Sequence, residues 1–256
     1  MAPSTSEFFA DEKARPLLEI AQMAARSGAE VLRRRREIGI GAADVRGRDI
    51  KLAEDKLSEA AIIASLRTAS FYPILAEESG WVPNEVVTAD AIYWAVDPLD
   101  GTFNYSRGIP LCCTSVALCM GMKPMLGAIF DFNRDEMFAG GKDVGFFINE
   151  NAVMRPSTGH EILTTGFPVR GHHGTEALEK LSSLESKWRK VRMLGSAALS
   201  LAWLAAGRVD GYEEQGIMWW DIAAGCALVE AAGGSVTIMG ASVQNPVDVR
   251  AVGATV

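Results

Sequence analysis

Apolar positions near the start of the chain recur at helical spacing. The positions are Leu17, Ala21, Ala24, Gly28 and Val31. Steps of four and three place these side chains on one face of a helix, so the pattern predicts a first amphipathic helix over about residues 16–37. The glycine-bearing stretch GIGAADVRGRD then indicates a loop, and a second helix is expected over about residues 49–68.

The middle of the chain carries short apolar runs rich in β-branched and aromatic residues, which favour strands. The runs are FYPILAEES, IYWAVD, CCTSVALCM and MLGAIFDF. The tetrapeptide GMKP between the last two runs is typical of a hairpin turn. The following segment, DEMFAGGKDVGFFINENAV, predicts further short strands with glycine turns.

The second half of the chain alternates less regularly between the two kinds of element. Strands are expected at EILTTGF, VRML and DGYEE, and a helix over residues 175–187. The segment GSAALSLAWLAAG predicts a helix opened by Ser196 and closed by Gly207, and WDIAAGCALVEAAGG predicts another with Asp221 near its N-cap. Mixed elements without strict alternation indicate a layered α/β or α+β fold rather than a barrel.

Composition limits the class of partner. The chain has 256 residues, of which 48% are hydrophobic and 22% charged, so it can bury a large core. A net charge of −7 argues against a nucleic-acid partner, which would need a basic face. The one dense basic run, residues 33–36, falls at the end of the first predicted helix and is read as a solvated helix end rather than an anion site.

Cysteine spacing and hydropathy favour a cytoplasmic protein. The four cysteines show no zinc-binding spacing, and three histidines cannot supply the usual imidazole ligands. The N-terminal residues lack the basic and apolar regions of a signal peptide. The longest apolar stretch, residues 197–206, is far shorter than the roughly 20 residues of a membrane span, so no membrane association is expected.

Two carboxylates stand close together in the stretch IYWAVDPLDGTFNYSRGIP. Asp97 ends the predicted strand before a proline, and Asp100 follows three residues later. Crowded carboxylates repel each other, and no Lys or Arg occurs in this stretch before Arg107, so a hard cation with oxygen ligands is the natural compensation. The N–H groups of Gly101 and Thr102 could face an anion, which together with a metal suggests phosphate chemistry.

Each acidic position also has a simpler interpretation. Asp-Pro and Asp-Gly pairs are common turn signals, so residues 97–101 could form two reverse turns. As a helix cap, Asp221 would stabilise the helix by about 1 kcal/mol, and capping alone would explain an aspartate at this position. Asp55 could be an exposed helix residue paired with Lys51 or Lys56. Glu77, in AEES, stands where a second strand ends and a loop begins.

The motifs AEES, WAVDPLDGTFNY and WWDIAAGCALVEAAGG, in this order, resemble those of the inositol monophosphatase family of magnesium-dependent, lithium-sensitive sugar and polyol phosphatases. The segment GSAALSLAWLAAGRVDGYEE fits the same pattern. The resemblance implies an αβαβα sandwich forming a single domain over residues 1–256, a homodimer, and a small phosphorylated polyol or sugar as substrate.

The resemblance also implies a metal site with two or three Mg²⁺ ions. Glu77, Asp97 and the backbone carbonyl of Leu99 would hold the first ion, and Asp97, Asp100 and Asp221 the second. Glu77 would contact a weaker third ion through water and help to position the attacking water.

The remaining roles concern the substrate. By the same resemblance, Gly101 and Thr102 would bind phosphate, and Asp55 would accept a hydrogen bond from the Thr102 hydroxyl, so that Glu77, Thr102 and Asp55 form the catalytic set. Ala197 and Glu214 would contact the alcohol portion of the substrate. The segment from about residue 195 to 214 should therefore set specificity.

The chain departs from the common family pattern at several positions. Leu52, preceded by Lys51, stands where a threonine is frequent, Phe103 where a threonine or arginine is frequent, and Tyr105 where phenylalanine is usual. Val256 ends the chain where an asparagine is often seen. Lys51 either adds positive charge near the phosphate or faces solvent.

Other phosphatase chemistries do not fit the chain. No cysteine begins a Cys-x5-Arg motif, the two aspartates do not form Asp-x-Asp, the RGHHG segment at residues 170–174 has the wrong order for a histidine phosphatase, and no Walker A sequence occurs. Inositol 1-phosphate is the favoured substrate, with histidinol phosphate as the alternative. A regulatory or binding protein that retains the fold is the hypothesis from a different class.

Overall fold

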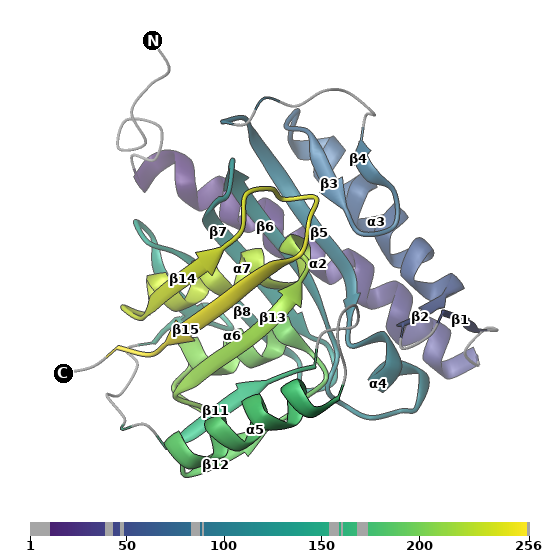
Figure 1. Cartoon of the computed structure of the whole chain (residues 1–256). Helices are drawn as coiled ribbons and strands as arrows, with labels where there is room; N and C mark the ends of the chain where they lie inside the picture. The colour runs from purple at the N-terminus through teal and green to yellow at the C-terminus, as the bar shows by residue number, and fades with distance from the viewer. Residues whose placement is uncertain are drawn as a thin grey trace.

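An eight-stranded sheet forms the middle of the protein in this computed structural model, which describes residues 11–38, 43–46, 49–82, 88, 90–153, 159, 161–167 and 174–254 (Figure 1). Its strands are β3 (Ile74–Ala76), β4 (Gly80–Val82), β5 (Ile92–Asp100), β6 (Cys113–Met120), β7 (Lys123–Asp131), β8 (Glu136–Gly141), β9 (Gly145–Ile148) and β10 (Asn151–Ala152). Their order is β10-β9-β8-β7-β6-β5-β3-β4, with β3 and β5 parallel and the other neighbours antiparallel.

A smaller, five-stranded sheet lies in front of the large one in the view of Figure 1. Its strands are β11 (Ile162–Thr165), β12 (Lys190–Arg192), β13 (Gly211–Ile217), β14 (Ser235–Met239) and β15 (Val247–Val252), in the order β12-β11-β13-β15-β14. β11 pairs in parallel with β12 and β13, whereas β15 is antiparallel to β13 and β14. Both sheets are therefore mixed.

The helices fill three layers around these sheets. α2 (Asp11–Ile38) and α3 (Ala53–Ala69) cover one face of the large sheet, and α6 (Ala197–Ala205) and α7 (Trp219–Ala231) lie between the two sheets. α5 (Thr175–Lys187) packs on the small sheet through Leu184 and Trp188. This arrangement confirms the layered αβαβα sandwich expected from the sequence.

Alternation along β5 divides the apolar residues between two cores. Trp94 and Val96 face the core beneath α2 and α3, whereas Tyr93 and Ala95 face the core that contains α6 and α7. Because successive side chains of a strand point to opposite faces, one strand serves both layers. α7 is buried along most of its length, which explains why its sequence is apolar all round. None of the helices described is both long and apolar enough to cross a bilayer.

Two helix boundaries differ from the prediction. α2 begins at Asp11, with Pro16 inside it, because the buried face of the helix already includes Ala14. The predicted second helix is wrong over its first residues: Asp49–Leu52 form β2, which pairs with β1 (Ala43–Arg46) inside the predicted loop. α3 starts after Leu52 because the Asp55 carboxylate accepts a hydrogen bond from the Leu52 N–H.

The strand containing the two aspartates is also longer than predicted. β5 continues through Pro98 to Asp100, and Asp97 pairs with Ser115 while Asp100 pairs with Cys113. The register shifts between these pairs, so Pro98 occupies an irregularity where its missing N–H is tolerated. The reverse turn expected after Asp97 therefore begins only at Gly101. β4 and β14 have no counterpart among the expected strands.

Candidate active site

A cavity of about 300 Å³ opens where β5 ends and α4 (Thr102–Ser106), α6 and α7 begin. Its described lining includes most of the residues singled out by the sequence, namely Glu77, Asp97, Leu99, Asp100, Gly101, Thr102, Ala197, Glu214 and Asp221. These residues come from positions up to 144 apart in the chain (221 − 77), and the fold brings them to one pocket. Asp55 lies behind this lining and reaches it through Thr102.

Two of the aspartates each accept one hydrogen bond from the backbone N–H of a nearby residue. The Leu99 N–H donates to Asp97 Oδ1 at 2.9 Å, and the Met218 N–H donates to Asp221 Oδ2 at 3.2 Å. Asp221 is the third residue of α7, three residues after the N-cap Met218, so it lies near the N-cap as predicted and its carboxylate caps the Met218 N–H. In both carboxylates the described residues supply no hydrogen bond to the other oxygen.

The carboxylates of the pocket disfavour one another's ionised forms. Burial raises the pKa of Asp97 well above its usual range, and the neighbouring charges of Glu77, Asp100 and Asp221 raise it further. Burial is also the largest cause of the raised pKa of Asp221, followed by repulsion from Glu77 and Asp100. The described lining contains no Lys, Arg or His. The described lining therefore gives the pocket a negative potential.

Asp100 is stabilised differently, by the N-terminus of α6. Its Oδ2 accepts hydrogen bonds from the Ser196 hydroxyl at 2.5 Å and from the Ala198 N–H at 2.6 Å. Burial raises the pKa of Asp100, while these hydrogen bonds act in the opposite direction. Ser196 opens α6 as predicted, but its bond to Asp100 was not foreseen, because residues 96 apart in sequence make it.

The Thr102 hydroxyl lies between two acceptors. It is 3.1 Å from Asp55 Oδ1 and 3.0 Å from the Leu99 carbonyl, and its single hydrogen can serve only one of them at a time. Asp55 is buried near the start of α3, which rules out the alternative of an exposed helix residue. Its second oxygen accepts from the Leu52 N–H, so the departure from threonine at position 52 does not disturb this contact.

Gly101 requires the conformation that glycine favours. Its φ of 85° is left-handed, and a Cβ added there would come within 2.7 Å of the Leu111 carbonyl. The glycine thus lets β5 turn sharply into α4, and both Gly101 and Thr102 line the pocket.

The oxygen-rich lining suits a hard cation, although the described carboxylate oxygens are not arranged around one common centre. No group of three or more His, Cys, Asp or Glu side chains within the described part of the chain is arranged so that it could hold a metal ion as it stands. Repulsion acts over several ångströms, whereas coordination of Mg²⁺ needs oxygens at about 2.0–2.1 Å from one centre. The metal-ligand set predicted from the sequence therefore stays a prediction.

Comparisons with known proteins identify the family. Residues 13–256 match the model of the inositol monophosphatase family. The chain is 40% identical over 192 residues to an inositol-1-monophosphatase of Mesorhizobium japonicum, covering 72% of this chain and 70% of the relative. It is 36% identical over 232 residues to the Nus factor SuhB of Salmonella typhimurium, covering 87% and 85%. A solved inositol monophosphatase from Anabaena has 33% identity and a TM-score of 0.73 over 92% of this chain and 90% of that one.

The chain belongs to the inositol monophosphatase family. Its layered fold is that of the family's phosphatases, which supports a phosphorylated substrate.

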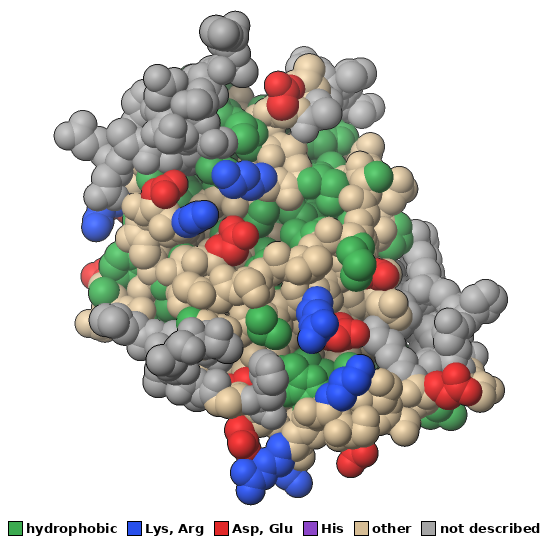
Figure 2. All heavy atoms as spheres, turned by 60° about the vertical axis from the view of Figure 1, so that its left-hand side comes forward, with side chains coloured by type: hydrophobic (Ala, Val, Ile, Leu, Met, Phe, Trp, Pro, Cys, Tyr) green, Lys and Arg blue, Asp and Glu red, His purple; other side chains and the backbone are tan. Residues whose placement is uncertain are grey.

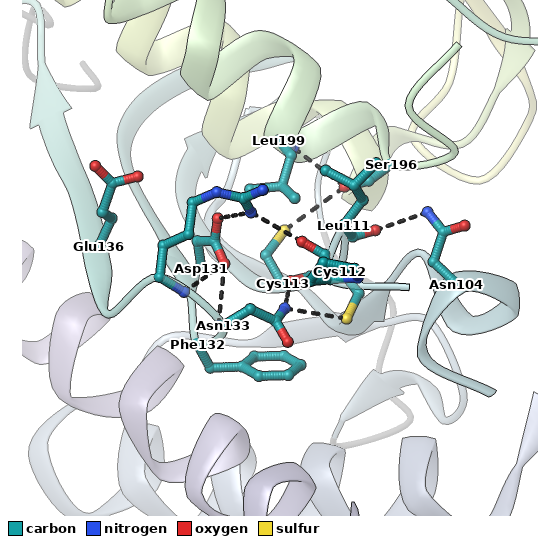
Figure 3. Close-up of polar contacts among 12 residues, drawn as sticks. Asn104, Leu111, Cys112, Cys113, Asp131, Phe132, Asn133, Glu136, Ser196 and Leu199 are labelled. Carbon is teal, nitrogen blue, oxygen red and sulfur yellow. Dashed lines mark hydrogen bonds and ion pairs between the residues drawn. The ribbon is translucent and has the colours of Figure 1, made fainter. Parts of the chain in front are cut away.

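A side chain that the sequence did not single out ties two loops of this family member together. Asn104 Nδ2 donates to the Leu111 and Leu194 carbonyls, each at 2.8 Å, and is 3.3 Å from the Gly195 carbonyl. Figure 3 shows Asn104 reaching from α4 toward Leu111, and the Cys113 thiol lying near Ser196. Gly195 has a φ of 71°, and a Cβ there would meet Asn104 Nδ2 at 2.9 Å. Asn104 therefore links the start of α4 to the segment before α6.

The far side of the pocket contains the residues expected near the alcohol portion. Glu214 lies on β13 and accepts a hydrogen bond from the Tyr212 hydroxyl at 2.8 Å. Gly166 leaves the room that the Glu214 carboxylate occupies, because a Cβ there would collide with it. Ala197 begins α6 on the same wall. The pocket is also lined by the apolar residues Phe103, Phe167 and Met193, which the sequence did not assign to it.

Some predictions fall outside what can be described. The Lys51 side chain, Val256 and most of the RGHHG segment (residues 170–173) lie outside the described residues.

Tyr105, which stands where phenylalanine is usual in the family, is buried. Its hydroxyl donates a hydrogen bond to the Leu32 carbonyl at 2.7 Å, so this additional polar group has a partner.

Proposed function

We propose that the protein is a Mg²⁺-dependent phosphomonoesterase that hydrolyses a small polyol or sugar phosphate, with inositol 1-phosphate as the favoured substrate and histidinol phosphate as the alternative. One observation carries the proposal. Four acidic residues, Glu77, Asp97, Asp100 and Asp221, line a single pocket beside Gly101 and Thr102, where burial and then repulsion among them raise the pKa of Asp97.

The donor set supports Mg²⁺ rather than a softer metal, because carboxylate and carbonyl oxygens are the ligands that hard cations prefer. Glu77, Asp97 and the Leu99 carbonyl would hold one ion, and Asp97, Asp100 and Asp221 a second. When bound, such a pair of ions supplies charge neutralisation to the phosphoryl oxygens and lowers the pKa of a bound water.

The chain's own residues then orient the reactants. The N–H groups of Gly101 and Thr102 would bind the phosphate oxygens, and Asp55 would hold the Thr102 hydroxyl so that its oxygen accepts a hydrogen bond from the attacking water. Glu77 would help to position the same water. Catalysis in this proposal rests on positioning and charge stabilisation, and it forms no phosphoenzyme.

The test is a panel of phosphate esters assayed for kcat/KM with Mg²⁺, with EDTA, and with Mg²⁺ restored after EDTA. The panel contains inositol 1-phosphate, histidinol phosphate, fructose 1,6-bisphosphate and adenosine 3′,5′-bisphosphate. We expect turnover of at least one ester that EDTA abolishes and Mg²⁺ restores, and inhibition by Li⁺. Turnover that is indifferent to chelation would exclude the mechanism. Light scattering of the same sample tests the proposed homodimer.

A second candidate is a regulatory or binding role, which is supported by relatives named Nus factor SuhB. On the face shown in Figure 2, Lys and Arg side chains lie among Asp and Glu rather than forming one continuous basic surface. That distribution and the net charge of −7 favour a protein partner over direct nucleic-acid binding. Uniform failure of the ester panel with Mg²⁺ would favour this second role.

A further inference from the structure

α3 is attached to β5 at the point where the strand enters the pocket. The Ser58 hydroxyl donates to the Pro98 carbonyl at 2.8 Å, directly after Asp97. The next residue of α3, Glu59, is only 2% exposed although it carries a carboxylate, and it is not among the described residues that line the pocket. Because a buried carboxylate is costly without partners, its hydrogen bonds indicate why it is there.

Glu59 holds the turn that carries Glu77. This turn consists of the three residues that connect β3 to β4. Glu59 Oε2 accepts a hydrogen bond from the Glu78 N–H at 2.8 Å, and Oε1 accepts one from the Ser79 hydroxyl. Hydrogen bonds to a carboxylate are stronger than those between neutral groups. A buried carboxylate therefore attaches the turn firmly to α3.

This attachment opposes a repulsion within the pocket. After burial, the charge of Glu77 is the largest cause of the raised pKa of both Asp97 and Asp221. Like charges at this separation favour movement of the turn away from β5. The two hydrogen bonds to Glu59 resist that movement, together with the Glu77 N–H, which donates to the Val96 carbonyl at 3.1 Å. Glu77 is therefore held near the other carboxylates before any cation arrives.

We propose that Glu59 is a positioning residue for the Mg²⁺ site: it holds the turn between β3 and β4, keeps the Glu77 carboxylate beside Asp97, and so raises the affinity of the pocket for Mg²⁺. Ligands that are already in place bind more tightly because less conformational freedom is lost on binding. This inference rests on the proposed phosphatase function and adds to it a residue outside the proposed ligand set.

The experiment measures the affinity of the substrate-free protein for Mg²⁺ by isothermal titration calorimetry. Glu59→Met keeps the length of the side chain and removes both accepting oxygens. We expect its Kd for Mg²⁺ to rise by about tenfold or more, the usual effect of replacing a residue that holds a metal ligand without touching the metal. Glu59→Gln should retain most of the affinity, because its amide can accept from the Glu78 N–H and donate to the Ser79 hydroxyl oxygen.

Ester hydrolysis gives a second measurement that a purely structural role would not change. With the panel ester that is hydrolysed fastest, the Mg²⁺ concentration for half-maximal rate should rise in Glu59→Met. At saturating Mg²⁺, kcat should recover and the KM for the ester should stay unchanged. Ser79→Ala, at an exposed position, removes one of the two hydrogen bonds and should raise the Kd for Mg²⁺ by a smaller factor.

Asp131→Leu is the matched control. Asp131 is also a buried carboxylate that holds a turn: its Oδ1 accepts from the N–H groups of Asn133 and Arg134 at 3.1 and 3.2 Å (Figure 3), and it is not among the described residues of the pocket. The control should lose thermal stability without a change in the Kd for Mg²⁺.

An unchanged Kd in Glu59→Met, or an equal rise in Asp131→Leu, overturns the positioning role of Glu59 while the phosphatase function stands. If Glu59→Met does not fold, an unchanged Kd in Ser79→Ala overturns it alone. An unmodified protein that neither binds Mg²⁺ nor hydrolyses any ester of the panel overturns both the positioning role and the phosphatase function.

Discussion

Replacing Asn104 with alanine tests whether the two loops of the pocket act as one unit. The side chain joins α4, which begins at Thr102, to the Leu194 and Gly195 carbonyls, which precede the Ser196 and Ala198 groups that bind Asp100. Asn104→Ala removes these links without touching any proposed metal ligand. The substitution should therefore disturb the geometry of the site and leave its charges intact.

The size of the effect follows from the hydrogen bonds. The Asn104 amide has two hydrogens and makes two short bonds, of 2.8 Å each, to the Leu111 and Leu194 carbonyls. At about 1 kcal/mol net for each bond, the variant should lose about 2 kcal/mol of unfolding free energy. For a chain of this length, that loss corresponds to a decrease of about 4–8 °C in Tm. Because a displacement of about 1 Å can cost up to a hundredfold in rate, kcat/KM should fall by at least about tenfold.

Asn133→Ala is the structural control. The Asn133 amide also spans two segments: it donates to the Cys112 carbonyl at 3.2 Å and accepts from Arg36 at 2.6 Å, but it is not among the described residues that line the pocket. Thermal unfolding and ester hydrolysis would be measured for both variants. We expect similar losses of Tm, but a loss of kcat/KM in Asn104→Ala alone. Equal activity in the two variants would refute the reasoning, because Asn104 would then contribute stability without positioning the site.

Three further predictions concern the carboxylates and Thr102. Asp97→Asn should abolish ester hydrolysis yet raise the unfolding free energy of the metal-free protein at pH 7, since it removes a buried charge; chemical denaturation in EDTA measures this, and a destabilised variant would contradict it. Because the pKa values of Asp97 and Asp221 are raised in the folded state, these two carboxyl groups bind protons more tightly in the folded protein than in the unfolded chain. Their contribution to stability is therefore present below about pH 4 and is lost as the pH rises through the raised folded pKa values. In EDTA, the difference in unfolding free energy between Asp97→Asn and the unmodified protein should narrow toward low pH. Thr102→Val should reduce kcat by about a hundredfold with little change in KM, whereas Thr102→Ser should retain most activity; a selective rise in KM for the valine variant would show that the hydroxyl serves binding instead.

Sequence patterns were sufficient for the elements that have a strong local signal. α5 begins and ends at the predicted residues, and Ser196 opens α6 as expected, because helical spacing and capping are properties of neighbouring residues. The positions of Glu77, Asp97 and Asp221 around one pocket came from the family motifs. Because these residues are far apart in the sequence, local spacing alone could not predict that they lie close together.

The features that were missed depend on contacts between distant segments. The extension of β5 to Asp100 requires β6 as a partner, since a proline and two turn-forming aspartates would otherwise favour a reverse turn at this point. The contact of Asp100 with α6, and those of Asn104 with the Leu194 and Gly195 carbonyls, are likewise made between distant segments. An asparagine two residues after Thr102 was a usable signal, but its partners could not be named from the sequence.

The carboxylates of the pocket differ in how strongly each would attract a cation. Asp100 already receives a hydroxyl and two N–H groups at the positive end of α6, and these hydrogen bonds offset part of the effect of burial on its pKa. Asp97 receives a single backbone N–H and experiences repulsion from three neighbouring acids. The unfavourable energy that an ion would relieve is therefore greater at Asp97, and at the similarly placed Asp221, than at Asp100. Asp100, which is fixed to α6, would instead determine where such an ion lies relative to Ala197, the first residue of that helix.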